Sequence, residues 1–184
     1  MAAVVLAAGG SRRFAGEGPK LTAPFRGRPL VTWAVEAALG AELNEVVVVT
    51  GAVDLEPLLP AAVTLLHNPA WASGQGGSLG VALDWCRRQG HEAAVVGLAD
   101  QPLVPAEAWK AVAGAPPAPV VVATYDGRRR NPVRLDRSVW PLLSLDGDEG
   151  ARSLMRGRPD LVAEVACQGN PMDIDTVEDL QAWS

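Results

Sequence analysis

Short apolar runs recur along the chain, and each is followed by a break rich in glycine or polar residues. Residues 2–8 form the first run, and they show no alternation of apolar and polar positions. This pattern is typical of a strand that is buried on both faces of a sheet. Further strands are predicted at residues 45–50, 62–66, 93–99, 119–124 and 160–167.

Apolar positions at helical spacing separate these strands. The stripe within residues 30–38 ends at Gly40, and the stripe within residues 81–86 ends at Gly90. Glycine is a common residue just after a helix, because it adopts left-handed backbone angles without strain. Further helices are predicted at residues 54–59, at residues 105–113, from about Gly150, and after a cap at Asp175 or Thr176.

Strand and helix alternate through most of the chain, and this order implies a parallel sheet with helices on both faces. The Asp-Gly pair within residues 125–135 predicts a hairpin. We therefore expect an α/β fold: a single Rossmann-like three-layer domain over residues 1–184, with a mostly parallel central sheet and one antiparallel hairpin strand. In such folds, ligands bind outside the carboxyl ends of the strands.

Composition narrows the classes of protein that the chain can belong to. Of the 184 residues, 48% are hydrophobic and 20% are charged, as in soluble globular domains. The net charge of −5 disfavours general nucleic-acid binding, and no apolar run has membrane-spanning length. The start lacks the basic residues of a signal peptide, so we expect a cytoplasmic protein with no nucleic-acid or membrane partner. Cys86 and Cys167 are expected to be reduced thiols without a chemical role.

A glycine-rich, basic segment follows the first strand. Gly9 and Gly10 let backbone N–H groups approach a ligand closely, and Arg13 and Lys20 add cations that complement phosphate oxygens. The segment has neither the Gly-Lys-Ser/Thr order of a Walker loop nor the spacing of the dinucleotide fingerprint. It therefore favours a nucleoside triphosphate site of another type, and a solvated surface loop is the alternative.

Two further segments are expected on the ligand side of the sheet. Asp100 directly follows the strand at residues 93–99, where its oxygen atoms suit Mg²⁺; a turn or helix cap is its alternative role. In the polar loop at residues 67–79, Gln75 and Ser78 suit hydrogen bonds to a base edge, and Ser78 is also a candidate helix cap.

Arginines in the carboxyl-terminal half predict a site for an anionic group. Arg152 is expected in the first turn of a helix, where backbone N–H groups favour phosphate, and Asp148 before it is a candidate N-cap. The three arginines at residues 128–130 are either solvated at a hairpin tip or clamp an anionic substrate.

These segments resemble the motifs of the molybdopterin nucleotidyltransferases, in the same order from residue 4 to residue 180. The similar stretches are Leu6-Ala7-Ala8-Gly9 with Ser11, Arg13, Gly16 and Lys20; Asn68, Trp71, Gly74, Ser78 and Leu79; Asp100-Gln101-Pro102; Asp148 to Arg152; and Asp173 to Leu180. Ala8 favours the cytidylyltransferase branch, because the guanylyltransferase branch tends to have glycine there. Arg130 and Asn131 replace the family's usual glycine and histidine, and Val177 replaces a proline.

The resemblance implies a role for each matching residue. The implied catalytic residues are Arg13, Lys20 and Asp100, and Mg²⁺ is implied on Asp100 and Asp173. Implied nucleotide-binding residues are Leu6, Ala7, Ala8, Gly9, Gly10, Ser11, Arg13, Lys20, Asn68, Gly74, Gln75, Ser78 and Leu79. Implied acceptor-binding residues are Gln101, Pro102, Tyr125, Arg130, Asn131, Pro132, Asp148, Gly150 and Arg152.

The function implied is transfer of CMP from CTP to the phosphate of molybdopterin, with release of pyrophosphate. CTP, a molybdopterin-type acceptor and a molybdenum hydroxylase client or its chaperone are the implied partners. Two alternatives stay open: a related transferase that uses GTP or another phosphorylated acceptor, and a non-catalytic module that handles the cofactor.

Overall fold

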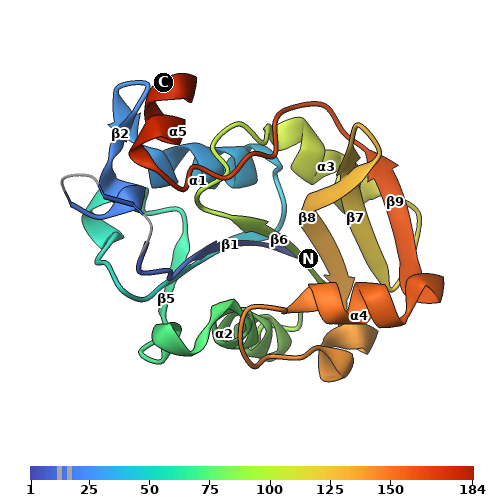
Figure 1. Ribbon diagram of the computed structural model, residues 1–184. Helices are drawn as coiled ribbons and strands as arrows, with labels where there is room; N and C mark the ends of the chain where they lie inside the picture. Colours follow the sequence, from blue (N-terminus) through green and yellow to red (C-terminus); the bar gives the residue numbers. More distant parts are fainter. Residues whose placement is uncertain (12–13, 16–17) are drawn as a thin grey trace.

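A twisted, mostly parallel sheet forms the middle layer of the molecule (Figure 1). The computed structural model describes residues 1–11, 14–15 and 18–184. Across these residues the sheet has seven strands, in the order β5 (Thr64–His67), β4 (Glu45–Thr50), β1 (Ala2–Ala7), β6 (Ala93–Leu98), β8 (Arg128–Asp136), β7 (Val120–Tyr125) and β9 (Val162–Ala166). Only β8 runs antiparallel to its neighbours among these described strands.

Helices cover both faces of this sheet. One face carries α1 (Leu30–Gly40), α3 (Ala106–Gly114) and α5 (Val177–Trp183), and the other carries α2 (Gln75–Arg88) and α4 (Ala151–Gly157) (Figure 1). The smaller elements are the ribbon of β2 (Pro24–Phe25) with β3 (Arg28–Pro29) and the 3-10 turns η1 (Lys20–Thr22), η2 (Glu56–Leu58), η3 (Trp71–Ser73), η4 (Arg137–Leu142) and η5 (Pro159–Leu161). The predicted α/β fold is confirmed.

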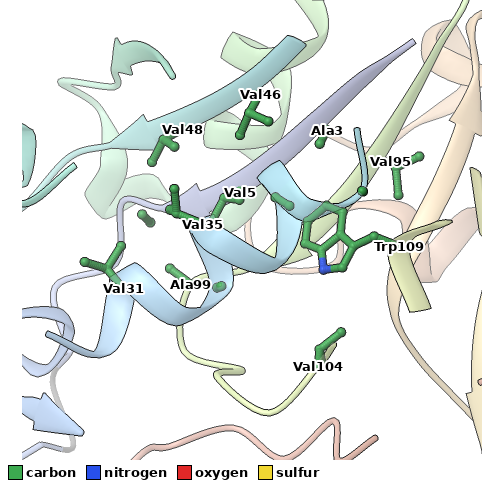
Figure 2. Packing of buried hydrophobic residues seen from close by; sticks show 14 of the residues in the cluster. Ala3, Val5, Val31, Val35, Val46, Val48, Val95, Ala99, Val104 and Trp109 are labelled. Atoms are coloured by element: carbon green, nitrogen blue, oxygen red, sulfur yellow. The ribbon is translucent and has the colours of Figure 1, made fainter. Parts of the chain in front are cut away.

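The central strand β1 is buried on both sides, as its uninterrupted apolar sequence predicts. Ala3 and Val5 pack toward α1 and α3, in a cluster that includes Val35 and Trp109 (Figure 2). Val4 and its alternate neighbours face the second cluster, which α2 closes. Because successive strand residues point to opposite faces, both helix layers are held by one strand.

The hairpin is also confirmed. Asp126 and Gly127 have φ angles of 49° and 73°, and two positive φ angles in succession are the geometry of a tight turn between twisted antiparallel strands. Strand β8 thereby enters the sheet between β6 and β7, while the arginines at residues 128–130 stay exposed near the tip.

Three predicted boundaries are wrong. Helix α2 begins at Gln75, earlier than predicted, because Gly74 adopts a φ of 121° and starts the helix directly after it. The glycines that read as loop form its first turn, where Gly76 packs against the backbone of Leu145. Residues 54–59 contain only the 3-10 turn η2, and strand β5 starts at Thr64.

No helix in the part of the chain that the structure describes is long and apolar enough to cross a membrane.

Replacement of Gly97 by alanine tests the packing between β6 and α3. A Cβ atom on Gly97 would lie 2.4 Å from the ring of Trp109, which is fully buried and has no room to move. We expect Gly97→Ala to lower the free energy of unfolding by about 1–3 kcal/mol, measured by urea denaturation. Gly114→Ala is the control, because nothing lies within 4 Å of its added atom. Equal midpoints for the two variants would contradict this account of the core.

Candidate active site

The candidate site lies where the carboxyl ends of β1 and β6 meet. Strand β1 is paired with β4 on one side and with β6 on the other, so the loops after β1 and β6 leave the sheet side by side. Ligands of parallel α/β sheets bind in the crevice at such a point. The glycine-rich segment after Ala7 and the Asp100 turn are therefore brought together, as expected.

A cleft of about 530 Å³, here called the first cleft, opens at this point. It is lined by Leu6, Ala8, Gly9, Gly10, Ser11, Lys20, Trp71, Ala72, Ser73, Gly74, Gln75, Ser78, Leu98, Asp100, Asp148, Arg152, Asp173 and Asp175. Most of the residues predicted to bind the nucleotide are in this set. Arg13 lies outside the described residues.

Lys20 is the cation at the floor of the first cleft. Its side chain is buried, and its Nζ atom donates to Asp100 Oδ2 over 2.7 Å and to Asp175 Oδ1 over 3.1 Å. Charge-assisted bonds of this length are among the strong hydrogen bonds of proteins. The lysine thus joins the segment after β1 to the end of β6 and to the segment before α5.

Asp173 faces the same cluster. Its Oδ1 atom accepts a hydrogen bond of 2.9 Å from Nε2 of Gln101, which also donates to the Pro171 carbonyl. Its side chain reaches solvent at the mouth of the cleft, but partial loss of hydration there and the nearby charge of Asp100 raise the pKa of Asp173. The carboxylates of Asp100 and Asp173 therefore repel each other, and a cation between them would relieve this repulsion.

The donor set suits a hard divalent cation only in part. No group of three or more His, Cys, Asp or Glu side chains in described positions could by itself hold a metal ion. Mg²⁺, however, is usually bound by one or two carboxylates together with substrate phosphates and water. Asp100 and Asp173 fit that pattern, which is the one expected for a metal that arrives with a nucleotide.

Asn68 and Ser78 support the first cleft from behind. The Asn68 amide donates to Ser78 Oγ over 3.0 Å and its oxygen accepts from the backbone N–H of Ala70, so it fixes the loop before α2. Asn68 does not line either cleft, and neither does Ala7, which is buried in the core. Ser78 lines the cleft but is not a helix cap, because α2 begins three residues before it.

Asp148 lines the first cleft and not the second, although it was predicted as an acceptor residue. Its Oδ1 atom accepts a hydrogen bond of 3.0 Å from the backbone N–H of Gln75, and the Gly147 carbonyl accepts one of 2.7 Å from the N–H of Gly76. Asp148 therefore caps α2, whereas α4 starts after Gly150, which has a φ of 49°. A carboxylate near a helix amino terminus is stabilising, because the free N–H groups there carry partial positive charge.

A second cleft of about 550 Å³ adjoins the first. Apolar side chains from four strands and two helices form much of its wall: Leu6, Leu79, Val96, Leu98, Val122, Val133, Leu135 and Met155. Its polar lining residues are Gln75, Gln101, Arg129, Arg130, Asn131, Glu149, Arg152, Arg156 and Asp173, and Gly150 and Ala151 complete it. The predicted acceptor residues Gln101, Arg130, Asn131, Gly150 and Arg152 are therefore together.

Besides Asp148, three predicted acceptor residues do not line this cleft. Tyr125 is buried in the core on the α1 side, where burial raises the pKa of its phenol. Pro102 and Pro132 are buried and line neither cleft. Tyr125 ends β7 with its side chain on the face opposite to the second cleft, which a motif match cannot reveal.

The arginines of the second cleft differ in their partners. Arg129 pairs with Glu164 over 2.7 Å, and Arg156 pairs with Glu149. The guanidinium of Arg152 makes no hydrogen bond or ion pair with any described residue, and Arg152 lines both clefts. It is therefore the guanidinium best placed, within the described chain, to receive an anion at the junction.

Comparison with known proteins assigns the chain to a family. The MobA-like NTP transferase domain matches residues 3–165. The chain belongs to this family.

Two similar proteins match almost the full length of this NTP transferase chain, and a third matches less than half of it. Nicotine blue oxidoreductase of Paenarthrobacter nicotinovorans is 32% identical, over 96% of the chain and 93% of the relative. The chain is also 36% identical to 2-C-methyl-D-erythritol 4-phosphate cytidylyltransferase of Parasynechococcus marenigrum (strain WH8102). This match extends over 76 residues, which are 41% of the chain and 33% of the relative. The crystal structure of Rv0371c from Mycobacterium tuberculosis H37Rv is similar with a TM-score of 0.83 and 25% identity, over 98% of the chain and 95% of that structure.

Sequence reasoning missed several residues of the two clefts. Asp175 was considered only as a helix cap, but Thr176 is the cap, since its side chain and that of Asp179 form a reciprocal capping box. Trp71 was part of a matched motif without a role, yet it lines the first cleft and packs against Gly10 and Gly51. The apolar wall of the second cleft is made of strand residues that read as ordinary core.

Replacement of Asp148 tests its link to α2. Asp148→Ala removes the acceptor of the Gln75 N–H and its charge, so we expect a loss of about 0.5–2 kcal/mol in the free energy of unfolding. Asp146→Ala is the matched control in the same loop, because Asp146 is exposed and has no partner among the described residues. Urea denaturation of both variants measures the difference, and equal stabilities would contradict the capping role.

Proposed function

We propose that the chain transfers CMP from CTP to the terminal phosphate of a molybdopterin-type acceptor and releases pyrophosphate. One observation carries the proposal: the two clefts meet over a shared wall. Leu6, Gln75, Leu98, Arg152 and Asp173 line both of them. Two substrates bound in adjoining clefts bring their reacting groups to the junction, and such positioning lowers the barrier of a two-substrate reaction.

The first cleft is proposed to hold the nucleotide. Gly9, Gly10 and Ser11 follow a buried strand and line the cleft, so their backbone can approach phosphate oxygens closely. Lys20 adds an ammonium group at the floor. Arg13, outside the described residues, is proposed to contact the triphosphate. Gln75 and Ser78 are proposed to lie near the base.

The second cleft is proposed to hold the acceptor. Its apolar wall suits the ring system of a flat heterocycle, and Arg152 at the junction suits the phosphate that such an acceptor carries. Arg130 and Asn131 line the same cleft. This arrangement would leave the acceptor phosphate facing the nucleotide.

The reaction would be an in-line displacement at phosphorus. An oxygen of the acceptor phosphate attacks the α-phosphorus of CTP, a new P–O–P bond forms, and the bond to the pyrophosphate leaving group breaks. Lys20 and Arg152 would neutralise negative charge on the two sides of the junction. Such electrostatic stabilisation of the transition state is the main contribution of a protein to phosphoryl transfer. Mg²⁺ held by Asp100 and Asp173 would supply further neutralisation of phosphate charge.

The choice of CTP rests on a small feature of the first cleft. Ala8 lines this cleft directly after the first strand, and its methyl group is proposed to occupy space that a larger purine would need. The partial similarity to a cytidylyltransferase supports the same choice. The proposal is tested against three alternatives: use of GTP, use of another phosphorylated acceptor, and a non-catalytic role in handling the cofactor. A molybdenum hydroxylase or its chaperone is the proposed client.

A second candidate function comes from a relative. The protein named nicotine blue oxidoreductase is 32% identical over nearly the whole chain, so electron transfer to a heterocyclic substrate is a second proposal for this fold. An apolar cleft beside a nucleotide-sized cleft would suit a flat acceptor in that reaction as well. The two functions differ in a measurable product.

One experiment separates these functions. The purified chain is incubated with Mg²⁺, molybdopterin and either CTP or GTP, and release of pyrophosphate is measured; oxidation of NADH and NADPH is followed in parallel with a heterocyclic dye. We expect pyrophosphate only when molybdopterin is present, and faster with CTP. Faster release with GTP would overturn the choice of base. Dinucleotide oxidation without pyrophosphate would overturn the transferase proposal.

Ala8→Gly tests the base choice. Loss of one methyl group beside the base makes room for a purine, and a methyl-sized difference in a pocket is worth about 1–3 kcal/mol. The ratio of kcat/KM for CTP to that for GTP should therefore fall, without complete reversal. Competition kinetics with both nucleotides measure this ratio. An unchanged ratio would place base selection elsewhere, for instance at Gln75 and Ser78.

Arg152→Ala tests the acceptor side. Loss of a charge-assisted contact worth roughly 1.5–3 kcal/mol should raise the KM for the acceptor about tenfold or more, with the KM for CTP nearly unchanged. Arg128→Ala is the control, since Arg128 is an exposed arginine that lines neither cleft. Should Arg152→Ala instead impair CTP binding alone, the two substrates would be on opposite sides from those proposed.

A further inference from the structure

Asp175 has no role in the proposed reaction, yet it makes a direct contact with a central group of the cleft. Its Oδ1 atom lies 3.1 Å from Nζ of Lys20, and the side chains of both residues are largely buried. An ammonium group has three N–H donors, and in this structure Lys20 shares them between Asp175 and Asp100. The position of the lysine is therefore set by two carboxylates that come from distant parts of the chain.

The backbone around Asp175 is fixed on both sides. Before it, the Ile174 N–H donates to the Asp100 carbonyl over 2.9 Å, and the Ile174 side chain is fully buried. After it, Thr176 and Asp179 form the capping box of α5, and Asp179 also accepts from the backbone N–H of Asp175. Asp175 thus offers its carboxylate from a rigid support, while helix capping is performed by its neighbours.

A divalent cation on Asp100 would change the balance between the two partners of Lys20. The cation and the ammonium group repel each other, and they compete for the same carboxylate, whose Oδ2 atom is 2.7 Å from Nζ. Without a second anchor, the lysine would either block the cation or be driven away from the cleft. Asp173 does not provide this anchor, because its carboxylate accepts a hydrogen bond from Gln101.

We propose that Asp175 is the positioning residue for Lys20: it draws the ammonium group away from Asp100 when a divalent cation binds there, and keeps it in the first cleft. The inference rests on the proposed function, because it assumes a cation on Asp100 and Asp173. In the empty cleft, Lys20 then neutralises the carboxylates. When a nucleotide and its cation are bound, Lys20 contacts phosphate, and Asp175 holds it in position for this change of partner.

Binding of Mn²⁺ alone tests this role without any measurement of activity. The full chain is titrated with Mn²⁺ in the absence of nucleotide, and free Mn²⁺ is followed by its electron paramagnetic resonance signal. Lys20→Met removes the competing cation, so its dissociation constant should fall by about threefold or more. Asp175→Asn removes one of the two carboxylates that contact Lys20 and leaves Asp100. The lysine then competes more strongly for Asp100, so the dissociation constant for Mn²⁺ should rise by a similar factor.

The double variant decides between positioning and direct action. If Asp175 acts through Lys20, Asp175→Asn should have almost no effect in a chain that already carries Lys20→Met. An equal effect in both backgrounds would mean that Asp175 acts on the metal directly, and would overturn the proposal. No effect of Asp175→Asn in either background would overturn it as well. Asp175→Ser removes the same charge and gives a second measurement of the same quantity.

Thr176→Ala is the matched control for displacement of the segment that leads into α5. It breaks the capping box beside Asp175, so it should lower the melting temperature but leave Mn²⁺ binding unchanged. A change as large as that of Asp175→Asn would attribute the effect to displacement of the tail and overturn the proposal. Absence of Mn²⁺ binding in every variant would remove the metal site of the proposed function together with this inference, whereas binding that is insensitive to Lys20 and Asp175 would remove the inference alone.

Discussion

The ammonium group of Lys20 joins three segments that are far apart in the sequence. It follows the glycine-rich segment, donates to Asp100 at the end of β6, and donates to Asp175 just before α5. Two half-buried carboxylates at the same edge of a sheet would repel each other without a cation between them. The closing of the carboxyl-terminal tail over the sheet therefore depends on this lysine, and so does the shape of the first cleft. A residue that binds substrate phosphate in the proposed reaction is, in the structure itself, an internal counter-ion.

The wall shared by the two clefts depends on a second junction, between α2 and the segment before α4. A Cβ atom on Gly74 would lie 2.4 Å from the backbone of Gly147, and the N–H groups of Gln75 and Gly76 are bound by Asp148 and Gly147. This close approach requires glycine at residue 74, whereas Gly147 has space for a Cβ atom but adopts a φ of 66°, which favours glycine. It fixes the start of α2, beside the first cleft, to the segment that leads into Arg152. Residues proposed to contact the nucleotide and the acceptor are thereby held on one connected support.

Most of the fold could be predicted from the sequence because the strands are apolar on both faces, and because helices separate them. The positions of Ala8 and Asp100 after two buried strands also sufficed to bring them to one edge, since parallel strands end on the same side, whereas Asp173 was placed there only by the family resemblance. The direction of a side chain at a strand end was beyond the sequence. Tyr125 matched a motif but points into the core, and Asp148 was placed with the acceptor but caps α2. Asp175 escaped notice because a carboxylate one residue before a cap looks structural, and only the fold shows that Lys20 reaches it.

The balance of charge in the first cleft constrains how a triphosphate enters it. Asp100, Asp173 and Asp175 bring three carboxylates to one place, and Lys20 is the single ammonium group among the described residues that pairs with any of them, contacting Asp100 and Asp175. Among these four side chains negative charge is in excess, and the pKa of Asp173 is raised first by partial loss of hydration and further by the nearby charges of Asp100 and Asp175. Addition of a divalent cation reverses this balance, because it brings two positive charges to the carboxylates and leaves the lysine for the phosphates. The same cluster that repels a bare triphosphate therefore favours one that arrives with its metal.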